Sequence, residues 1–277
     1  MVKRIKRRFD LRKTLFLLPN LITLSSIFCG FDAIVVAAGA NGDEGQYYRA
    51  ALLIVFAMFF DTLDGRVARA TKTQSSFGLQ IDSLADVVSF GVAPSMLVYQ
   101  WTLHRLGTTG LIVSFIFTAM GAVRLARFNV LTMGEAGKPT KPSKYIVGLP
   151  TPGAAGILVS IVVANHAASG ILGGAEYTWA ILIITLVLSS FMVSTIRFRS
   201  FKEIKPNLRT GLFVAAIAGS SAVISAKLQP AFVLVWLLGC YVMMGVCETL
   251  WELPGRLRER AALSRDSNPP DPPDTVA

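Results

Sequence analysis

The feature that most constrains this chain is a series of long apolar segments. A helix needs about 20 mainly apolar residues to cross the roughly 30 Å hydrocarbon core of a bilayer. The sequence therefore predicts an all-α fold, a polytopic transmembrane helix bundle. The eight expected spans are Leu15–Ala40, Tyr48–Asp64, Asp82–Leu103, Gly110–Phe128, Pro152–Ala168, Tyr177–Ile196, Gly211–Lys227 and Pro230–Trp251.

Composition supports a membrane protein and argues against an ordinary soluble domain. Hydrophobic residues make up 53% of the chain and charged residues only 16%, whereas soluble domains are about 25% charged. The segment Tyr48–Asp64 is a span only if its helix continues beyond Asp64. The fifth and seventh segments are short and could pack as tilted pairs, so six to eight spans are compatible with the sequence. We expect a basic arm at residues 1–14, a transmembrane domain at 15–251, and a cytoplasmic tail at 252–277 that is disordered at its end.

The distribution of positive charge predicts how the bundle lies in the membrane. With eight spans, 24 of the 27 lysines and arginines fall on one side. Loops rich in these residues stay in the cytoplasm, so both termini are expected there, in a protein of the cell (inner) membrane. The basic side should attract anionic membrane lipids. A nucleic-acid partner is not expected, because no soluble basic domain is available to bind one.

Four aspartates follow one another at helical spacing near the boundary between the second and third expected spans. Asp61 and Asp64 are three residues apart and Asp82 and Asp86 are four apart, so each pair shares one helix face. A short turn between the two helices would bring the four carboxylates together. This arrangement predicts a carboxylate cluster at the cytoplasmic end of the bundle.

Converging carboxylates repel each other unless a cation lies between them. Hard divalent cations such as Mg²⁺ and Mn²⁺ prefer carboxylate oxygens and are commonly held together with substrate phosphates. Gly65 and Ala68 leave space beside the helix backbone, and Arg69 supplies a cation suited to phosphate oxygens. The pattern favours a metal-dependent phosphate site, while solvated helix ends and the ion site of a transporter remain alternatives.

The same stretch resembles the signature of the CDP-alcohol phosphatidyltransferase family. It matches D-x2-D-G-x2-A-R-x8-G-x3-D-x3-D in full, from Asp61 to Asp86. The resemblance implies a six-helix membrane core, a homodimer, and a divalent cofactor, Mn²⁺ or Mg²⁺, as two ions. It also implies metal ligands at Asp61, Asp64, Asp82 and Asp86, a general base at Asp86, and CDP contacts at Gly65, Ala68, Arg69 and Gly78.

Five further stretches resemble the integral-membrane phosphatidylserine synthases of that family. They are LPNLITLSSIFCGF (18–31), SFGVAPS (89–95), RLARFN (124–129), GLPTP (148–152) and VSTIRFRSFK (193–202). The resemblance implies transfer of a phosphatidyl group from CDP-diacylglycerol to L-serine. The aspartates are shared with relatives that use glycerol 3-phosphate, inositol phosphate or choline, so other acceptor alcohols remain open.

Several polar residues near the expected inner boundary are candidates for acceptor or phosphate contacts. Gly91 and Pro94 should distort the third span and open a small pocket beside Asp86. Cationic side chains there could pair with a serine carboxylate, although snorkelling of each arginine to the membrane surface is an alternative. The candidates are Asn20, Ser76 or its neighbour Ser75, Ser89, Arg124, Arg127 and Asn129.

Overall fold

The structure, a computed structural model, describes residues 11–71, 73, 75–132, 145–199, 219–221, 223–225, 230, 232–240 and 242–244. The first helices are α1 (Leu11–Ala38), α2 (Glu44–Ala70), α3 (Ser76–Asp86) and α4 (Ala93–Trp101). They are followed by α5 (Thr108–Thr132), α6 (Thr151–Ala167) and α7 (Thr178–Val193). Short helical segments are η1 (Val87–Val92), η2 (Leu103–Leu106), η3 (Ile171–Gly173) and η4 (Ala175–Tyr177).

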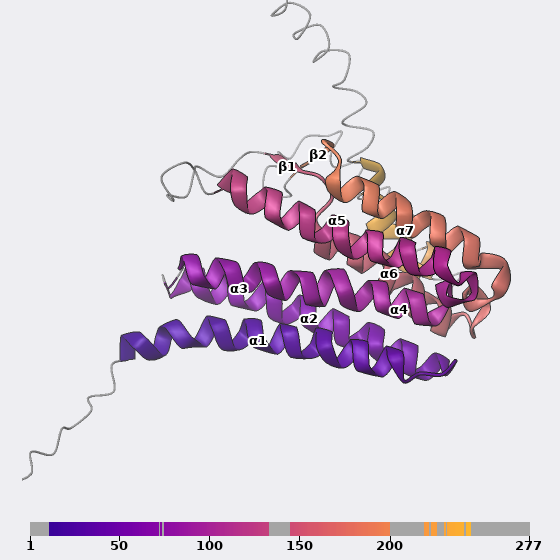
Figure 1. The fold of residues 1–277 in the computed structure, drawn as a ribbon, viewed down its shortest axis with the longest axis horizontal. Coiled ribbons are helices and arrows are strands. Elements are labelled where there is room, and N and C mark those ends of the chain that lie inside the picture. Colours follow the sequence, from indigo (N-terminus) through magenta and orange to yellow (C-terminus); the bar gives the residue numbers. More distant parts are fainter. Residues whose placement is uncertain are drawn as a thin grey trace, which may run out of the picture.

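The long helices lie side by side and form an elongated bundle (Figure 1). Helix α1 packs along α2, and it also contacts α3, η1 and α4. Helix α5 packs on α7, and α6 contacts both α2 and α7. The aspartate-bearing end of α2 and the start of α3 therefore lie at one end of the bundle, and the α1–α2 turn lies at the other (Figure 1).

The α1–α2 hairpin forms because its turn and its interface both suit close helix pairing. Asn41 and Gly42 adopt positive φ angles of 47° and 89°, and the Asp43 carboxylate accepts a hydrogen bond from Gly45 N at the start of α2. Small side chains such as those of Ala33 and Ala50 are completely buried. Small residues let helix backbones approach closely, which is how helices associate in a membrane.

The third expected span is one continuous helical segment with a π-helix in its middle. Helix α3 runs through η1, a π-helix, directly into α4. This confirms the expected local distortion around Gly91 and Pro94. The wide turn is fixed by two neighbours: the Ser89 hydroxyl donates to the Ser26 carbonyl of α1 at 3.0 Å, and the Thr118 hydroxyl of α5 donates to the Gly91 carbonyl at 3.2 Å.

Four described helical segments are long and apolar enough to cross a membrane: 18–38, 76–101, 108–130 and 175–193. Large apolar side chains such as Phe28, Phe59 and Phe115 are exposed, as expected of surfaces that face lipid. The chain is therefore a helical membrane protein. Helix α2 continues past Asp64, to Ala70, but it is not among these four segments.

Other sequence predictions about the ends of the chain lie largely outside the described residues. The expected spans 211–227 and 230–251 are described only in short helical pieces. The tail at 252–277 and the first ten residues of the basic arm are also outside that part. Helix α1 begins at Leu11, four residues before the expected start of the first span.

One short antiparallel strand pair accompanies the helices, and the sequence did not predict it. Strands β1 (Tyr145–Val147) and β2 (Arg197–Arg199) pair with Val147 opposite Arg197. Gly148 follows β1 with a φ of +81°, and a Cβ there would lie close to the Met192 carbonyl. The backbone NH groups of Gly148 and Leu149 donate to Ile196 and Phe191 carbonyls. Pairing beyond the ends of α5 and α7 is a long-range event that local sequence patterns do not encode.

Candidate active site

The aspartates are brought together by the connection between α2 and α3. This connection closes tightly, because the backbone NH groups of Thr71 and Thr73 donate to the carbonyls of Val67 and Ala68. The Ser75 hydroxyl then caps α3 by accepting from Gly78 N at 2.9 Å. The short turn expected from the sequence is present, and α1 packs against both helices.

Three of the four aspartates form one compact group. Ligand oxygens of Asp61, Asp64 and Asp82 all lie within 4.8 Å of one another. Asp64 is only 4% exposed, and the other two are partly buried. The fourth, Asp86, interacts electrostatically with Asp61 and Asp82. Its Oδ1 atom is buried and has no hydrogen-bond partner within the described residues.

The cluster fits a divalent cation. Partly buried carboxylates this close repel one another and lose hydration, and a hard cation offsets both effects. The unsatisfied Asp86 oxygen offers a further ligand atom beside the three-aspartate group. Four carboxylates from two helices thus supply oxygen donors of the type that Mg²⁺ and Mn²⁺ prefer.

Thr23 of α1 completes the group, and the sequence reasoning missed it. Its hydroxyl donates to Asp64 Oδ2 at 2.5 Å, and Thr23 is buried. The contact orients one carboxylate of the cluster from a separate helix. A usable signal existed, because Thr23 follows Asn20 by three residues and shares its helix face.

The residues expected to contact CDP lie around this cluster. The Arg69 guanidinium lies over Gly65, where an added Cβ would be 3.6 Å from Arg69 Nη1. At the start of α3, a Cβ on Gly78 would lie 3.7 Å from Asn20 Oδ1, so Asn20 faces the same region. Ala68 is partly buried, on the same turn of α2 as Arg69. Ser76 is exposed, whereas its neighbour Ser75 is the residue that caps α3.

A cavity of about 220 Å³ adjoins the aspartates. Asp82, Asp86, Arg124 and Asn129 are among the residues that line it, and Pro150 and Pro152 form part of its wall. The Arg124 side chain interacts electrostatically with Asp86, and its Nη1 donates to Thr151 Oγ1 at 3.1 Å. Asn129 Nδ2 donates to Ser83 Oγ at 2.9 Å. The cavity therefore combines two carboxylates, a guanidinium and an amide.

Four of the six candidates for acceptor or phosphate contacts are not among the residues that line this cavity: Asn20, Ser76, Ser89 and Arg127. Ser89 is completely buried, with its hydroxyl donated to α1. Arg127 is exposed and its Nη1 donates to the Val193 carbonyl at 3.2 Å. The Ser89 hydroxyl is thus directed to α1 and the Arg127 guanidinium to the end of α7. Conversely, Ser83 lines the cavity and Thr151 accepts a hydrogen bond from Arg124, and neither residue was predicted.

Fold and site together define a polytopic helical membrane protein with a carboxylate centre suited to divalent cations and a polar cavity beside it. Residues 16–191 match the family model for CDP-alcohol phosphatidyltransferase. This match covers more than half of the chain, and the chain belongs to that family. The match spans α1 to α7 and includes all four aspartates.

Individual relatives are similar over most of their length. A Helicobacter pylori protein named CDP-diacylglycerol–serine O-phosphatidyltransferase is 38% identical over 237 residues, covering 86% of this chain and 92% of that protein. A Bacillus subtilis protein of the same name is 33% identical and covers 70% of this chain and 97% of its own. A Mycobacterium leprae protein with that name is 30% identical, and the match covers 85% of this chain and 76% of that protein.

Proposed function

We propose that this protein transfers the phosphatidyl group of CDP-diacylglycerol to L-serine, giving phosphatidylserine and CMP. The observation that carries the proposal is the 38% identity to a relative named for this reaction, of which 92% is covered. The arrangement of the aspartates supports the chemistry, because the relatives' shared reaction handles a diphosphate. The membrane helices suit a substrate with a lipid tail.

The four aspartates are proposed to hold two divalent ions, Mg²⁺ or Mn²⁺. Asp61, Asp64 and Asp82 would supply one group of ligands, and Asp86 would add its otherwise unsatisfied oxygen. Ions in such a site neutralise charge on phosphate oxygens during displacement. Thr23 would keep the Asp64 carboxylate in a fixed orientation. Gly65, Ala68, Arg69 and Gly78 are proposed to bind the CDP part, with Asn20 nearby.

The cavity beside Asp86 is proposed to bind serine. Arg124 would pair with the serine carboxylate, because a guanidinium suits a carboxylate in two-point contact. Asn129 would complete the polar lining. Asp86 would accept the proton of the serine hydroxyl as the hydroxyl oxygen bonds to the lipid-linked phosphorus. The bond from that phosphorus to the CMP oxygen breaks, and CMP leaves with the electron pair. Arg69 would stabilise the phosphate charge.

This reaction is tested by offering purified protein CDP-diacylglycerol, Mg²⁺ or Mn²⁺, and one alcohol at a time. We expect CMP release with serine and little release with glycerol 3-phosphate, inositol phosphate or choline. Release with glycerol 3-phosphate but not with serine would replace the proposed acceptor. If no alcohol gives CMP, the protein is not this transferase, and ion flux in liposomes would then favour a transporter.

The role of Asp86 is tested separately with Asp86→Asn. We expect turnover to fall by about 10³-fold or more, because the hydroxyl proton loses its acceptor, whereas CDP-diacylglycerol binding is largely retained. Asp32→Asn removes the same charge from the membrane helix α1 and serves as the control, with activity near that of the wild type. Equal loss of binding and turnover in Asp86→Asn would assign Asp86 to substrate binding instead.

We also propose the finer arrangement in the membrane. The charge asymmetry supports eight spans, both termini in the cytoplasm and the aspartate end of the bundle facing the cytoplasm, where CMP and serine are soluble. The homodimer rests on family resemblance, and the mass of the detergent-solubilised protein in native mass spectrometry tests it. A monomer mass under conditions that preserve activity would count against the dimer.

A further inference from the structure

A second polar cavity lies at the end of the bundle opposite the aspartates. Its volume is about 370 Å³, within the lower range of small-molecule sites. Glu44 lines it at the start of α2, whereas Asp61 lies 17 residues further along the same helix. That separation corresponds to about 25 Å. The cavity is therefore distinct from the proposed transferase site.

The cavity lies at the depth of lipid head groups. Ala38 and Trp101 are the last residues of two candidate membrane spans, and both line the cavity. Tyr47 also lines it and donates its hydroxyl to the Gln100 carbonyl at 2.7 Å. Tyrosine and tryptophan are typical of the membrane–water boundary. A ligand in this cavity would have access both to water and to the adjoining lipid.

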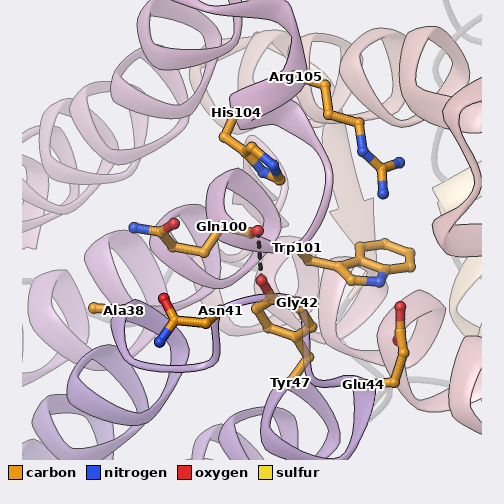
Figure 2. A pocket seen from close by; sticks show the side chains of 9 residues that line it. All are labelled: Ala38, Asn41, Gly42, Glu44, Tyr47, Gln100, Trp101, His104 and Arg105. Carbon is orange, nitrogen blue, oxygen red and sulfur yellow. Dashed lines mark hydrogen bonds between the residues drawn. The ribbon is translucent and has the colours of Figure 1, made fainter.

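Charged groups of opposite sign are separated within the cavity (Figure 2). The partly buried Glu44 carboxylate lies on the inner side, where Asn165 Nδ2 donates to its Oε2 at 2.6 Å. Arg105 and His104 are exposed on the opposite side. Arg105 uses Nη1 to donate to the Gly173 carbonyl, which fixes the guanidinium while leaving its other N–H donors to the cavity.

The inner side also carries the buried indole of Trp101. Trp101 is 2% exposed, and its Nε1 faces the Glu44 carboxylate and favours the ionised form of that group. The indole nitrogen points to the side on which Glu44 lies (Figure 2).

We propose that this cavity binds a zwitterion made of a phosphate and a primary ammonium, as in the head group of an aminophospholipid. The ammonium would donate to Glu44, and the phosphate would accept from Arg105 and His104. Burial raises the pKa of the Glu44 carboxyl, which precedes the expected span, and nearby Trp101 and Arg105 oppose the rise. An ammonium beside it would favour its ionised form.

The chemistry distinguishes this ligand from other head groups. A quaternary ammonium has no N–H to donate to Glu44. A head group without a cation offers the Glu44 carboxylate no charged partner. A head group with an additional carboxylate would be repelled by Glu44. The same phosphate and ammonium groups occur in free phosphoethanolamine and in phosphatidylethanolamine. The proposal goes beyond transferase activity and does not depend on it.

Native mass spectrometry of the full chain with defined lipids tests the proposal. We expect phosphatidylethanolamine to be retained about tenfold or more over phosphatidylcholine and phosphatidylglycerol. Glu44→Gln keeps an acceptor for Asn165 but removes the charge, and should abolish this preference. Asp43→Asn removes the same charge one residue away, retains its capping oxygen, and should leave the preference intact. Free phosphoethanolamine in competition distinguishes recognition of the head group alone from recognition of the lipid.

Wild-type protein without a preference for the primary ammonium would overturn the proposal, as would an unchanged preference in Glu44→Gln. If Glu44→Gln does not fold, the exposed residue His104 provides a second test. His104→Ala should weaken the binding of all phospholipids alike. The ratio of bound phosphatidylethanolamine to bound phosphatidylcholine should stay the same. A change of that ratio, or unchanged binding of every phospholipid, would contradict the assigned position of the phosphate.

Discussion

Thr23 shows how a single hydroxyl from one helix can fix a carboxylate on another. The Thr23 hydroxyl donates to Asp64 Oδ2 and also lies 3.1 Å from the Pro19 carbonyl of its own helix. Groups that orient a metal ligand matter nearly as much as the ligand itself. Thr23 is therefore a positioning residue for the proposed metal site rather than a catalytic one.

Thr23→Val keeps the shape of the side chain and removes the hydroxyl. We expect activity to fall about 10- to 100-fold, together with a higher Mg²⁺ or Mn²⁺ concentration for half-maximal activity, because Asp64 loses its orientation. Titration of activity against metal concentration measures both effects. Thr23→Ser should restore most activity.

Ser25→Ala is the matched control for that experiment. Ser25 is partly buried and its hydroxyl donates to the Leu21 carbonyl of the same helix, so its removal should leave the metal dependence unchanged. A Thr23→Val protein that titrates with metal like the wild type would contradict the positioning role. A loss of activity at unchanged half-maximal metal concentration would indicate a structural role instead.

At the scale of elements, the π-helix η1 determines how the third span follows Asp86. It begins directly after Asp86, so its wide turn sets the direction in which the aspartate-bearing helix leaves the site. Helix α1 packs tightly against it, since a Cβ on Gly30 would lie 2.7 Å from Ser89 Oγ and 2.8 Å from Ser89 Cα. π-helical turns within longer helices are frequent at functional sites.

Gly30→Ala is therefore expected to push α1 away from η1. We expect a lower melting temperature and lower transferase activity, because the new methyl group meets backbone that cannot move aside. Gly153→Ala in α6 is the control, since its nearest neighbours lie at 3.9 Å and alanine favours helix. Thermal unfolding in detergent measures the first effect and CMP release the second. Equal stability of Gly30→Ala and the wild type would contradict the close approach of α1 and η1.

At the scale of the whole molecule, charge asymmetry predicts the orientation of the bundle. Fusions of a fluorescent protein at the C-terminus and after Arg209 should fluoresce in a bacterial host, because both positions are expected in the cytoplasm. Alkaline phosphatase fused after Ala168 should be active, since that position is expected on the other side. An active phosphatase at the C-terminus would contradict an even number of spans.

The two ends of the bundle differ in chemistry, and this difference follows from the folding of α2. In its first turn, Glu44 lines a cavity that also contains the basic residue Arg105. In its last turns, Asp61 and Asp64 belong to an acidic cluster. Because one helix holds both groups, the two proposed sites stay about 25 Å apart. Each site can then be altered without contact with the other.

The sequence by itself determined the membrane class, the helical segments and the aspartate cluster. Apolar length is a local property, and the three- and four-residue spacings fix which carboxylates share a helix face. The resemblance added the family. These predictions succeed because each depends on a single segment or on two helices joined by a short turn.

Only the tertiary structure decided which side chains from other helices reach the site. Thr23 reaches Asp64, and Arg124 and Asn129 line the cavity, whereas Ser89 and Arg127 point elsewhere. The β1–β2 pair and the cavity around Glu44 likewise join segments far apart in the chain. The direction of a side chain between helices depends on how the helices pack, and packing is set by many weak contacts at once rather than by any local pattern.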